Sequence, residues 1–197
     1  MRKVVLFMSV SVDGYFEGPD RDISWSRVDE GLHLHLNRVI ARLGGLISGR
    51  VTHELMADFW PTADQDPDAS PAVVEFARIW RDLPKTVFSR TLTRADWNTT
   101  VLPEVTPAAV AALTAGEGGD LALGGADLAE TFFRLGLVDE YRLYVHPVRL
   151  GRGRLLFPAT PESTGLTLLE TRSFPTGVVL LHYARTPVSS ANAAVPA

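Results

Sequence analysis

The sequence predicts an α/β domain whose central sheet is mostly parallel, with antiparallel strands added at its C-terminal end. Strand-like apolar runs alternate with segments of helical spacing over the first two thirds of the chain, which is typical of parallel sheets. Two strand-like runs then follow each other near the C-terminus, as in a hairpin. The 197 residues contain no internal repeat and no linker, so we expect one domain over residues 1–186 and a flexible tail over 187–197.

The N-terminal half supplies the first alternation of strands and helices. Residues 3–12 (KVVLFMSVSV) form a nearly continuous apolar run, which predicts a central strand buried on both faces. A loop rich in glycine, aspartate and proline follows, and apolar residues at helical spacing then predict a helix between Val28 and Leu43. The next expected elements are a strand at 44–50, a short helix at 51–60, a loop at 61–70, and a helix from Ser70 (N-cap) and Pro71 towards Trp80.

The C-terminal half continues the alternation and then ends in strands. Strands are expected at 85–90 and 97–103, and Thr106 followed by Pro107 repeats the signal for a helix start. The segment DLALGG predicts a strand that ends in Gly124 and Gly125, and the helix after it closes at Gly136. The last expected strands lie at 140–148, 165–174 and 177–185, with the turn of a hairpin at 175–177.

Composition and charge exclude several classes of protein. The net charge of −4 provides no basic surface for nucleic acid, and no apolar run approaches the roughly 18 residues that a membrane span needs. The N-terminal MRKVVLFMSVSVDG is a poor signal peptide, because Asp13 interrupts a short apolar run and no cleavage site follows. Without cysteine, and with histidines at spacings that suit no metal motif, we expect no metal site. These observations favour a soluble cytoplasmic protein.

The expected strand ends carry the residues that suit a ligand. In open α/β sheets ligands bind beyond the carboxyl ends of the strands, which here read SVDG, LISGRVT, VFSRT and LALGGAD. Gly49 permits a ligand to approach the backbone closely, and the Arg50 guanidinium can bind a phosphate through two N–H groups. The Thr52 hydroxyl and the free N–H groups of the first helical turn can also bind an anion. Taken singly, these residues are equally a turn glycine, a surface charge and a helix cap. No G-x-G-x-x-G fingerprint and no Walker A motif occurs.

Taken in their order along the chain, these segments resemble the dihydrofolate reductase-like superfamily. The resemblance is to the group related to the C-terminal reductase domain of bifunctional riboflavin-biosynthesis deaminase/reductases, and it covers residues 3–183. Its most specific part is the order of a paired-glycine strand end, a helix, GLVDEY, HPV and LGRGRLLF. The other matching segments are FMSVSVDGYFEG, LISGRVTHEL and KTVFSRTL.

The resemblance implies a single-domain, three-layer dihydrofolate reductase-like fold and an NADPH-dependent reductase. Hydride would pass to a C=N or C=O group of a small heterocyclic or ribosylated substrate, such as 5-amino-6-(5-phosphoribosylamino)uracil. The alternatives are a dihydrofolate reductase-type activity and a cofactor-binding protein without turnover. Relatives also imply a homodimer through the C-terminal strands. The implied NADPH contacts are Ser9, Gly49, Arg50, Thr52, Ser89, Arg90, Leu123, Gly124 and Gly125, with Arg50, Ser89 and Arg90 favouring the 2′-phosphate.

The proton donor is open between two carboxylates. Related reductases place a carboxylate five residues after a tryptophan, which matches Trp25 as a substrate contact and Glu30 as the acid. Glu30 is equally a first-turn carboxylate favoured by the helix dipole, and Asp13, the second candidate, is equally a turn former. Asp127 adds a negative charge to the first turn after Gly125, so a pyrophosphate at that turn requires its carboxylate to point away.

Overall fold

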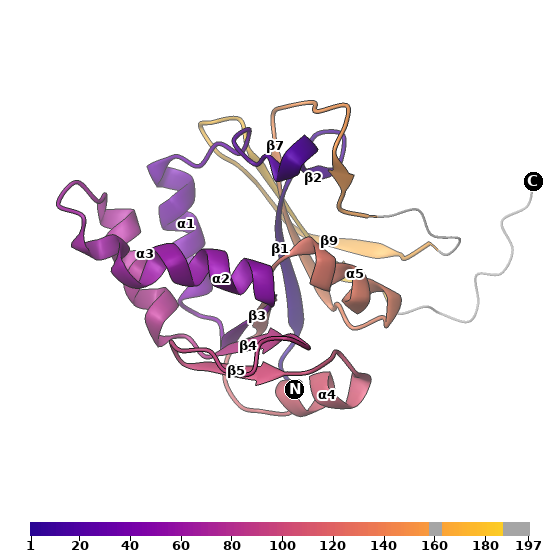
Figure 1. Ribbon diagram of the computed structural model, residues 1–197. Coiled ribbons are helices and arrows are strands. Elements are labelled where there is room, and N and C mark those ends of the chain that lie inside the picture. Colours follow the sequence, from indigo (N-terminus) through magenta and orange to yellow (C-terminus); the bar gives the residue numbers. More distant parts are fainter. Residues whose placement is uncertain (158–162, 187–197) are drawn as a thin grey trace, which may run out of the picture.

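An eight-stranded sheet runs through the molecule in the order β5-β4-β3-β6-β1-β7-β10-β9. The computed structural model describes residues 1–157 and 163–186, so the predicted flexible tail at 187–197 lies outside the described residues. Figure 1 shows the strands in one layer with helices on both sides. The strands are β1 (Val4–Ser11), β3 (Gly45–Gly49), β4 (Lys85–Phe88), β5 (Thr99–Leu102), β6 (Leu121–Leu123), β7 (Glu140–His146), β9 (Leu166–Ser173) and β10 (Val179–Arg185).

The direction of the strands confirms the predicted fold class. β1 lies between β6 and β7 and runs parallel to both, and β3, β4 and β5 continue the parallel part of the sheet. β10 is antiparallel to β7, and β9 is antiparallel to β10. The hairpin turn between these two strands uses Gly177, at a φ of 84° that favours glycine. The run at 3–12 is therefore the central strand that its apolar sequence predicts.

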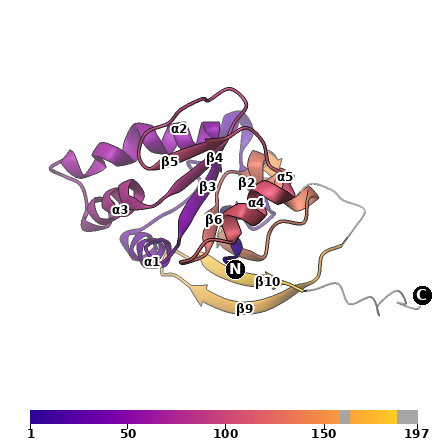
Figure 2. The same ribbon diagram turned by 90° about the horizontal axis from the view of Figure 1, so that it is seen from below.

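Within residues 1–157 and 163–186, five α-helices cover the two faces of the sheet. α1 (Glu30–Ile40), α2 (Arg50–Phe59) and α3 (Pro71–Asp82) lie on one side, and α4 (Pro107–Thr114) and α5 (Ala126–Arg134) lie on the other (Figures 1 and 2). Both predicted caps are confirmed, because the Ser70 side chain accepts from the N–H of Val73 and the Thr106 side chain from that of Ala109. Within the described residues, no helix has the length and apolar character that a membrane crossing requires.

A small second sheet was not expected from the sequence. β2 (Tyr15–Glu17) pairs antiparallel with β8 (Arg154–Leu155), and together they form what we call the flap. The β2 segment was expected to be a loop, because it is rich in glycine, aspartate and proline. Short 3-10 helices, η1 (Pro19–Arg21) and η2 (Trp60–Gln65), also replace parts of expected loops. Gly153 makes the flap possible, since a Cβ there would lie 2.1 Å from the Glu17 carbonyl oxygen.

Two hydrophobic clusters hold the three layers together. On the α5 side, Leu6, Ile47 and Phe132 are almost fully buried, and Leu123 joins them from β6. On the α1 side, a smaller cluster forms around Leu32, Tyr144, Phe174, Val178 and Leu180. Burial of one such leucine or phenylalanine side chain stabilises a fold by about 1.5–3 kcal/mol. The carboxyl ends of β1, β3 and β6 are thus fixed by a core that packs on both faces of the sheet.

Candidate functional site

A cleft of about 460 Å³ opens at the carboxyl ends of β1 and β3. The first turns of α2 and α5 form two of its walls, and Phe16 and Glu17 of the flap form a third. Six of the residues predicted from the sequence line it, namely Ser9, Trp25, Gly49, Arg50, Thr52 and Gly125. The fold therefore brings together residues that lie more than 100 positions apart in the chain.

The contact between Gly125 and Thr52 holds the two helix starts together. Gly125 has a φ of 88°, and a Cβ added to it would lie 2.5 Å from the Thr52 hydroxyl oxygen. Gly124 differs, because a Cβ at that position would meet no atom within 4 Å. Gly125 thus permits the close approach of α5 to α2, and Gly124 leaves open space at the end of β6.

Among the described α-helices, α2 and α5 differ from the others because no side chain caps their N-termini. Gly49 and Gly125 occupy their N-cap positions and have no side chain to accept a hydrogen bond from the helix N–H groups, whereas Asp29, Ser70 and Thr106 cap the other three described α-helices. A helix N-terminus has free N–H groups and the positive end of the helix dipole. Two such ends at one cleft form a site suited to an anion with more than one charged group.

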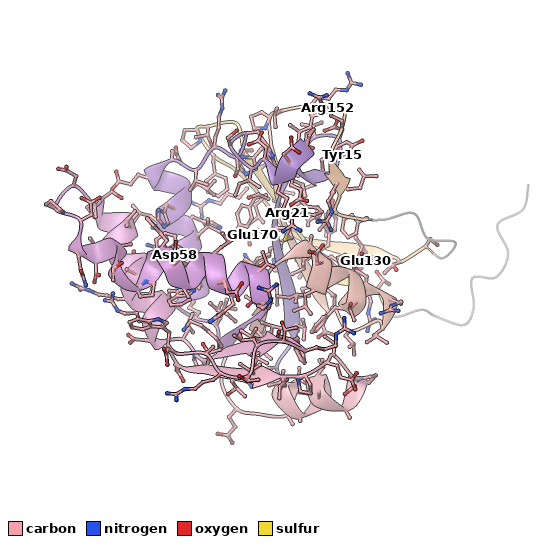
Figure 3. The ribbon with its side chains drawn as sticks, viewed as in Figure 1. Tyr15, Arg21, Asp58, Glu130, Arg152 and Glu170 are labelled. Carbon is pink, nitrogen blue, oxygen red and sulfur yellow. The ribbon has the colours of Figure 1, made fainter. Side chains whose placement is uncertain are left out.

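Charged side chains add to the positive potential of the two helix N-termini at the cleft. Arg50 begins α2 and donates to Glu54 at 2.7 Å, and both side chains are about half exposed. Arg21, labelled in Figure 3, also lines the cleft. Arg154 of the flap donates to Glu17 at 2.9 Å and also pairs with Asp127. Asp127 lines the cleft, against the expectation that its side chain would point away, but its carboxylate pairs with Arg154, which partly neutralises its charge.

Arg154 also separates the cleft from a neighbouring cavity of about 380 Å³. This cavity extends between Tyr15 on the flap and Glu130 on α5, both of which Figure 3 labels. Phe16 and Ala126 line both spaces, and the Arg154 guanidinium lies 5.0 Å from the centre of the Phe16 ring. The flap therefore rests against the start of α5 through one arginine with two carboxylate partners.

Trp25 lines the cleft beside a buried histidine that sequence reasoning did not select. The Trp25 and His146 rings meet edge to face, with their centres 5.4 Å apart. His146 is fully buried, its Nδ1 accepts from the N–H of Arg27, and its Nε2 lies 3.5 Å from the Ser26 hydroxyl. Burial lowers the pKa of His146, so the ring is neutral at neutral pH and carries its proton on Nε2. The HPV segment was the available signal, but it gave no role for the ring.

The two predicted acids lie outside the lining of this cleft. Glu30 is exposed in the first turn of α1, and the side chain of Asp29 caps that helix. Asp13 accepts from the hydroxyl of Ser11 and from the N–H groups of Leu150 and Gly151 at 2.7 to 3.1 Å. These hydrogen bonds, chiefly the one from Ser11, lower the pKa of Asp13 to about 2. The acid role of both residues stays a prediction, and at neutral pH Asp13 has no proton to donate.

Four predicted cofactor contacts lie near the cleft without lining it, namely Ser89, Arg90, Leu123 and Gly124. Ser89 and Arg90 follow β4, one strand outward from Gly49, so they flank the same edge of the sheet. The Ser89 hydroxyl accepts from the N–H groups of Thr91 and Leu92, which shapes the turn. Leu123 is fully buried at the end of β6. Among residues 1–157 and 163–186, no group of three acidic or histidine side chains is arranged to hold a metal ion.

Comparison with known proteins gives one family. Residues 2–180 match the family model of the RibD C-terminal domain. The uncharacterized protein YyaP of Bacillus subtilis (strain 168) is 33% identical over 188 residues, which cover 92% of this chain and 94% of that protein. The uncharacterized protein YwjB of the same organism is 29% identical over 186 residues, which cover 93% of this chain and 98% of that protein.

Solved structures share the fold. A putative riboflavin biosynthesis protein from Shewanella sp. PV-4 superposes with a TM-score of 0.70 at 21% identity, over 95% of this chain and all of that one. RibD of Acinetobacter baumannii gives a TM-score of 0.63 at 21% identity, over 94% of this chain and 58% of that one. At these identities the similarity is one of architecture.

Proposed function

The chain belongs to the RibD C-terminal domain family and has the dihydrofolate reductase-like fold, and on this premise we propose that it is an NADPH-dependent reductase. Its substrate is a small heterocyclic or ribosylated molecule with a reducible C=N or C=O group. The observation that carries the proposal is the pair of uncapped helix N-termini, of α2 and α5, at a single cleft. A dinucleotide has the two linked phosphates that such a pair suits.

The residues of the cleft fit this cofactor. The open space at Gly124 and the close packing at Gly125 leave room for a pyrophosphate beside the end of β6. Ser9, Gly49, Arg50 and Thr52 complete the proposed phosphate and nicotinamide contacts. Ser89 and Arg90 lie at the outer end, where a 2′-phosphate would extend, and Leu123 contributes backbone only. When bound, the cofactor supplies the hydride.

The protein's own contribution is to orient the substrate and exclude water. Met8, Ile23, Val51 and Leu55 give the cleft apolar walls, and the Trp25 ring offers a flat surface for a heterocycle. To polarise the reducible group, we propose that the Ser26 hydroxyl donates a hydrogen bond to it, since this hydroxyl lines the cleft and lies 3.5 Å from Nε2 of His146. Glu30 remains the alternative proton donor that the family resemblance implies, whereas Asp13 is ionised at neutral pH and has no proton to donate. Replacement of Ser26 with alanine should lower kcat more than it changes KM.

Two assays test the function. Titration with NADPH should show saturable binding, and its absence at physiological concentrations would refute the proposal. Oxidation of NADPH should then be followed with 5-amino-6-(5-phosphoribosylamino)uracil and, separately, with dihydrofolate. Turnover of the first supports a riboflavin-type reductase, and turnover of the second supports a folate-type enzyme. Tight binding without turnover of either supports a cofactor-binding protein.

The Arg50→Ala variant is expected to bind NADPH about tenfold more weakly than the wild-type protein. Arg50 is the cation closest to the start of α2, and the loss of a charge-assisted hydrogen bond has an effect of this order. NADH should be affected less, because it lacks the 2′-phosphate that Arg50 is proposed to favour. Fluorescence titration with NADPH and with NADH measures, for each cofactor, the ratio of the variant's Kd to that of the wild type.

Glu54→Gln is the matched control for this experiment. Glu54 holds the Arg50 guanidinium at 2.7 Å without lining the cleft, so its neutral variant should bind NADPH as tightly as the wild type or more tightly. Equal losses for NADPH and NADH in the Arg50 variant would contradict the proposed phosphate preference.

We also propose that the protein is a homodimer joined along β9. β9 is the edge of the sheet, and its leucines Leu166, Leu168 and Leu169 are 40–52% exposed. An edge strand with exposed apolar side chains is a site for pairing with another copy. The Leu168→Glu variant is expected to change the mass measured by light scattering from twice the chain mass to the chain mass. Val28→Glu, at a similarly exposed position before α1, should leave the dimer intact.

A further inference from the structure

A second groove, of about 510 Å³, lies on the α1 side of the sheet and shares no lining residue with the cleft. α1 forms one wall, and β1 and β7 form the floor. The curved β10–β9 pair passes alongside α1 in Figure 2, and Glu170 and Arg172 of β9 complete the lining. The proposed function makes no use of this groove.

Four arginines from three elements converge on this groove. Arg38 lies on α1, Arg42 in the turn after it, Arg142 on β7 and Arg172 on β9. Within the described residues Arg38, Arg42 and Arg172 form no ion pair, and Arg142 is 3.9 Å from a carboxylate oxygen of Glu170. In a chain with a net charge of −4, such a concentration of cations is local and is not compensated at short range.

The three carboxylates of the groove offset only part of the charge of the four arginines. Glu140 is buried and already engaged, with Lys3 Nζ at 2.5 Å and His182 Nε2 at 2.7 Å. Asp120 accepts from the backbone N–H of Lys3 at 2.8 Å. Among the described residues, Glu170, which Figure 3 labels, is the carboxylate of the groove that pairs with one of these arginines, and its distance of 3.9 Å to Arg142 is long for an ion pair. A ligand with two negative charges would relieve the remaining repulsion.

Aromatic rings hold two of the guanidinium groups in place. Arg142 lies over Phe7, at 5.8 Å from the ring centre, and Arg172 lies over Phe174, at 5.4 Å. Stacking fixes the plane of a guanidinium and leaves its N–H edges free for a planar or tetrahedral anion. Buried His35 also lines the groove, and burial, with the nearby charge of Arg172, lowers its pKa. The neutral imidazole adds no cation of its own.

We propose that this groove binds a small phosphate ester or diphosphate, separately from the cofactor cleft. Arginine forks match phosphate oxygens in geometry, and a diphosphate can engage Arg142 and Arg172 together with Arg38. The volume suits a ligand of metabolite size. The acidic net charge of the chain disfavours a long polyanion such as nucleic acid.

Calorimetric titration with inorganic pyrophosphate tests the proposal on the full-length wild-type protein and on three variants of it. The Arg38→Ala/Arg172→Ala double variant removes two exposed side chains and should weaken groove binding at least tenfold. Glu170→Gln should strengthen it, because a competing carboxylate is lost. Arg50→Ala reports on the cleft, where pyrophosphate is also expected to bind, and should leave the groove component unchanged.

Unchanged pyrophosphate binding in the double variant would overturn the proposal, as would loss of all binding in the Arg50 variant alone. The mass of the double variant, measured by light scattering, distinguishes a ligand site from an interface between copies of the chain. If its mass falls to that of one chain, the arginines belong to an interface between copies and the ligand site is refuted. NADPH affinity should be unchanged in the double variant, so this result is independent of the proposed reductase activity.

Discussion

Replacing Gly125 with alanine is expected to lower the free energy of unfolding by about 3 kcal/mol and to remove measurable NADPH binding. The residue has a φ of 88°, where a side chain is strained by about 1–3 kcal/mol. The new Cβ would also lie 2.5 Å from the Thr52 hydroxyl oxygen, so α5 must move away from α2. Both helix starts at the cleft would then be displaced. Urea unfolding and NADPH titration measure the two effects.

Gly124→Ala is the matched control, because its Cβ would meet no atom within 4 Å. Its free energy of unfolding should stay within about 0.5 kcal/mol of the wild-type value, as for other unstrained surface changes. The Gly125→Ala/Thr52→Ala double variant removes the contact and leaves the backbone strain, so it should recover part of the stability. A Gly125→Ala protein as stable as the Gly124→Ala protein would refute this account of the paired glycines.

Replacing Glu140 with alanine is expected to lower the free energy of unfolding by about 3 kcal/mol. Glu140 is 6% exposed and joins three parts of the fold, since Lys3 precedes β1 and His182 lies on β10. Its removal leaves the buried His182 ring without its 2.7 Å partner. Thermal and urea unfolding of the variant measure the loss. A change of less than about 1 kcal/mol would contradict a structural role for this carboxylate.

The same residue makes stability depend on pH in the acid range. Burial on its own raises the pKa of Glu140, but the hydrogen bonds from Lys3 and His182 outweigh it and hold the pKa below the ordinary value of 4.5. A carboxyl with a lowered folded-state pKa stabilises the protein above pH 4.5 and loses that contribution as the pH falls below it. The Glu140→Gln variant should therefore lose less stability than the wild type between pH 4.5 and pH 3.

Much of the fold could be predicted because local signals agree with the tertiary structure. The Ser70-Pro71 and Thr106-Pro107 pairs start helices where expected, since cap and proline both act within one turn. The apolar run at 3–12 is the central strand because both its faces are covered. The flap could not be predicted, because β2 and β8 have three and two residues and pair across more than 130 positions. No local periodicity indicates such a pair.

The candidate site was predictable where backbone geometry determines it. Gly49, Thr52 and Gly125 are at the cleft because they begin helices at adjacent strand ends. The contribution of side chains from long loops was not predictable. Ser26 and His146 meet across 120 positions, and Arg154 reaches Asp127 through the flap. The expectation that Asp127 would point away took no account of Arg154, which holds its carboxylate at the cleft wall.

The position of β6 has a consequence for how the chain folds. β1 is made first, yet both of its neighbours come from the second half of the sequence, with Val4 beside Leu121 and Val5 beside Glu140. Such distant pairings close long loops, which slows folding. During synthesis, β1 therefore emerges from the ribosome as an unpaired apolar strand, and more than 100 further residues must follow before its first partner, β6, is made. The nascent chain must keep this strand from aggregating, and fragments that end before β6 should not fold into an independent unit.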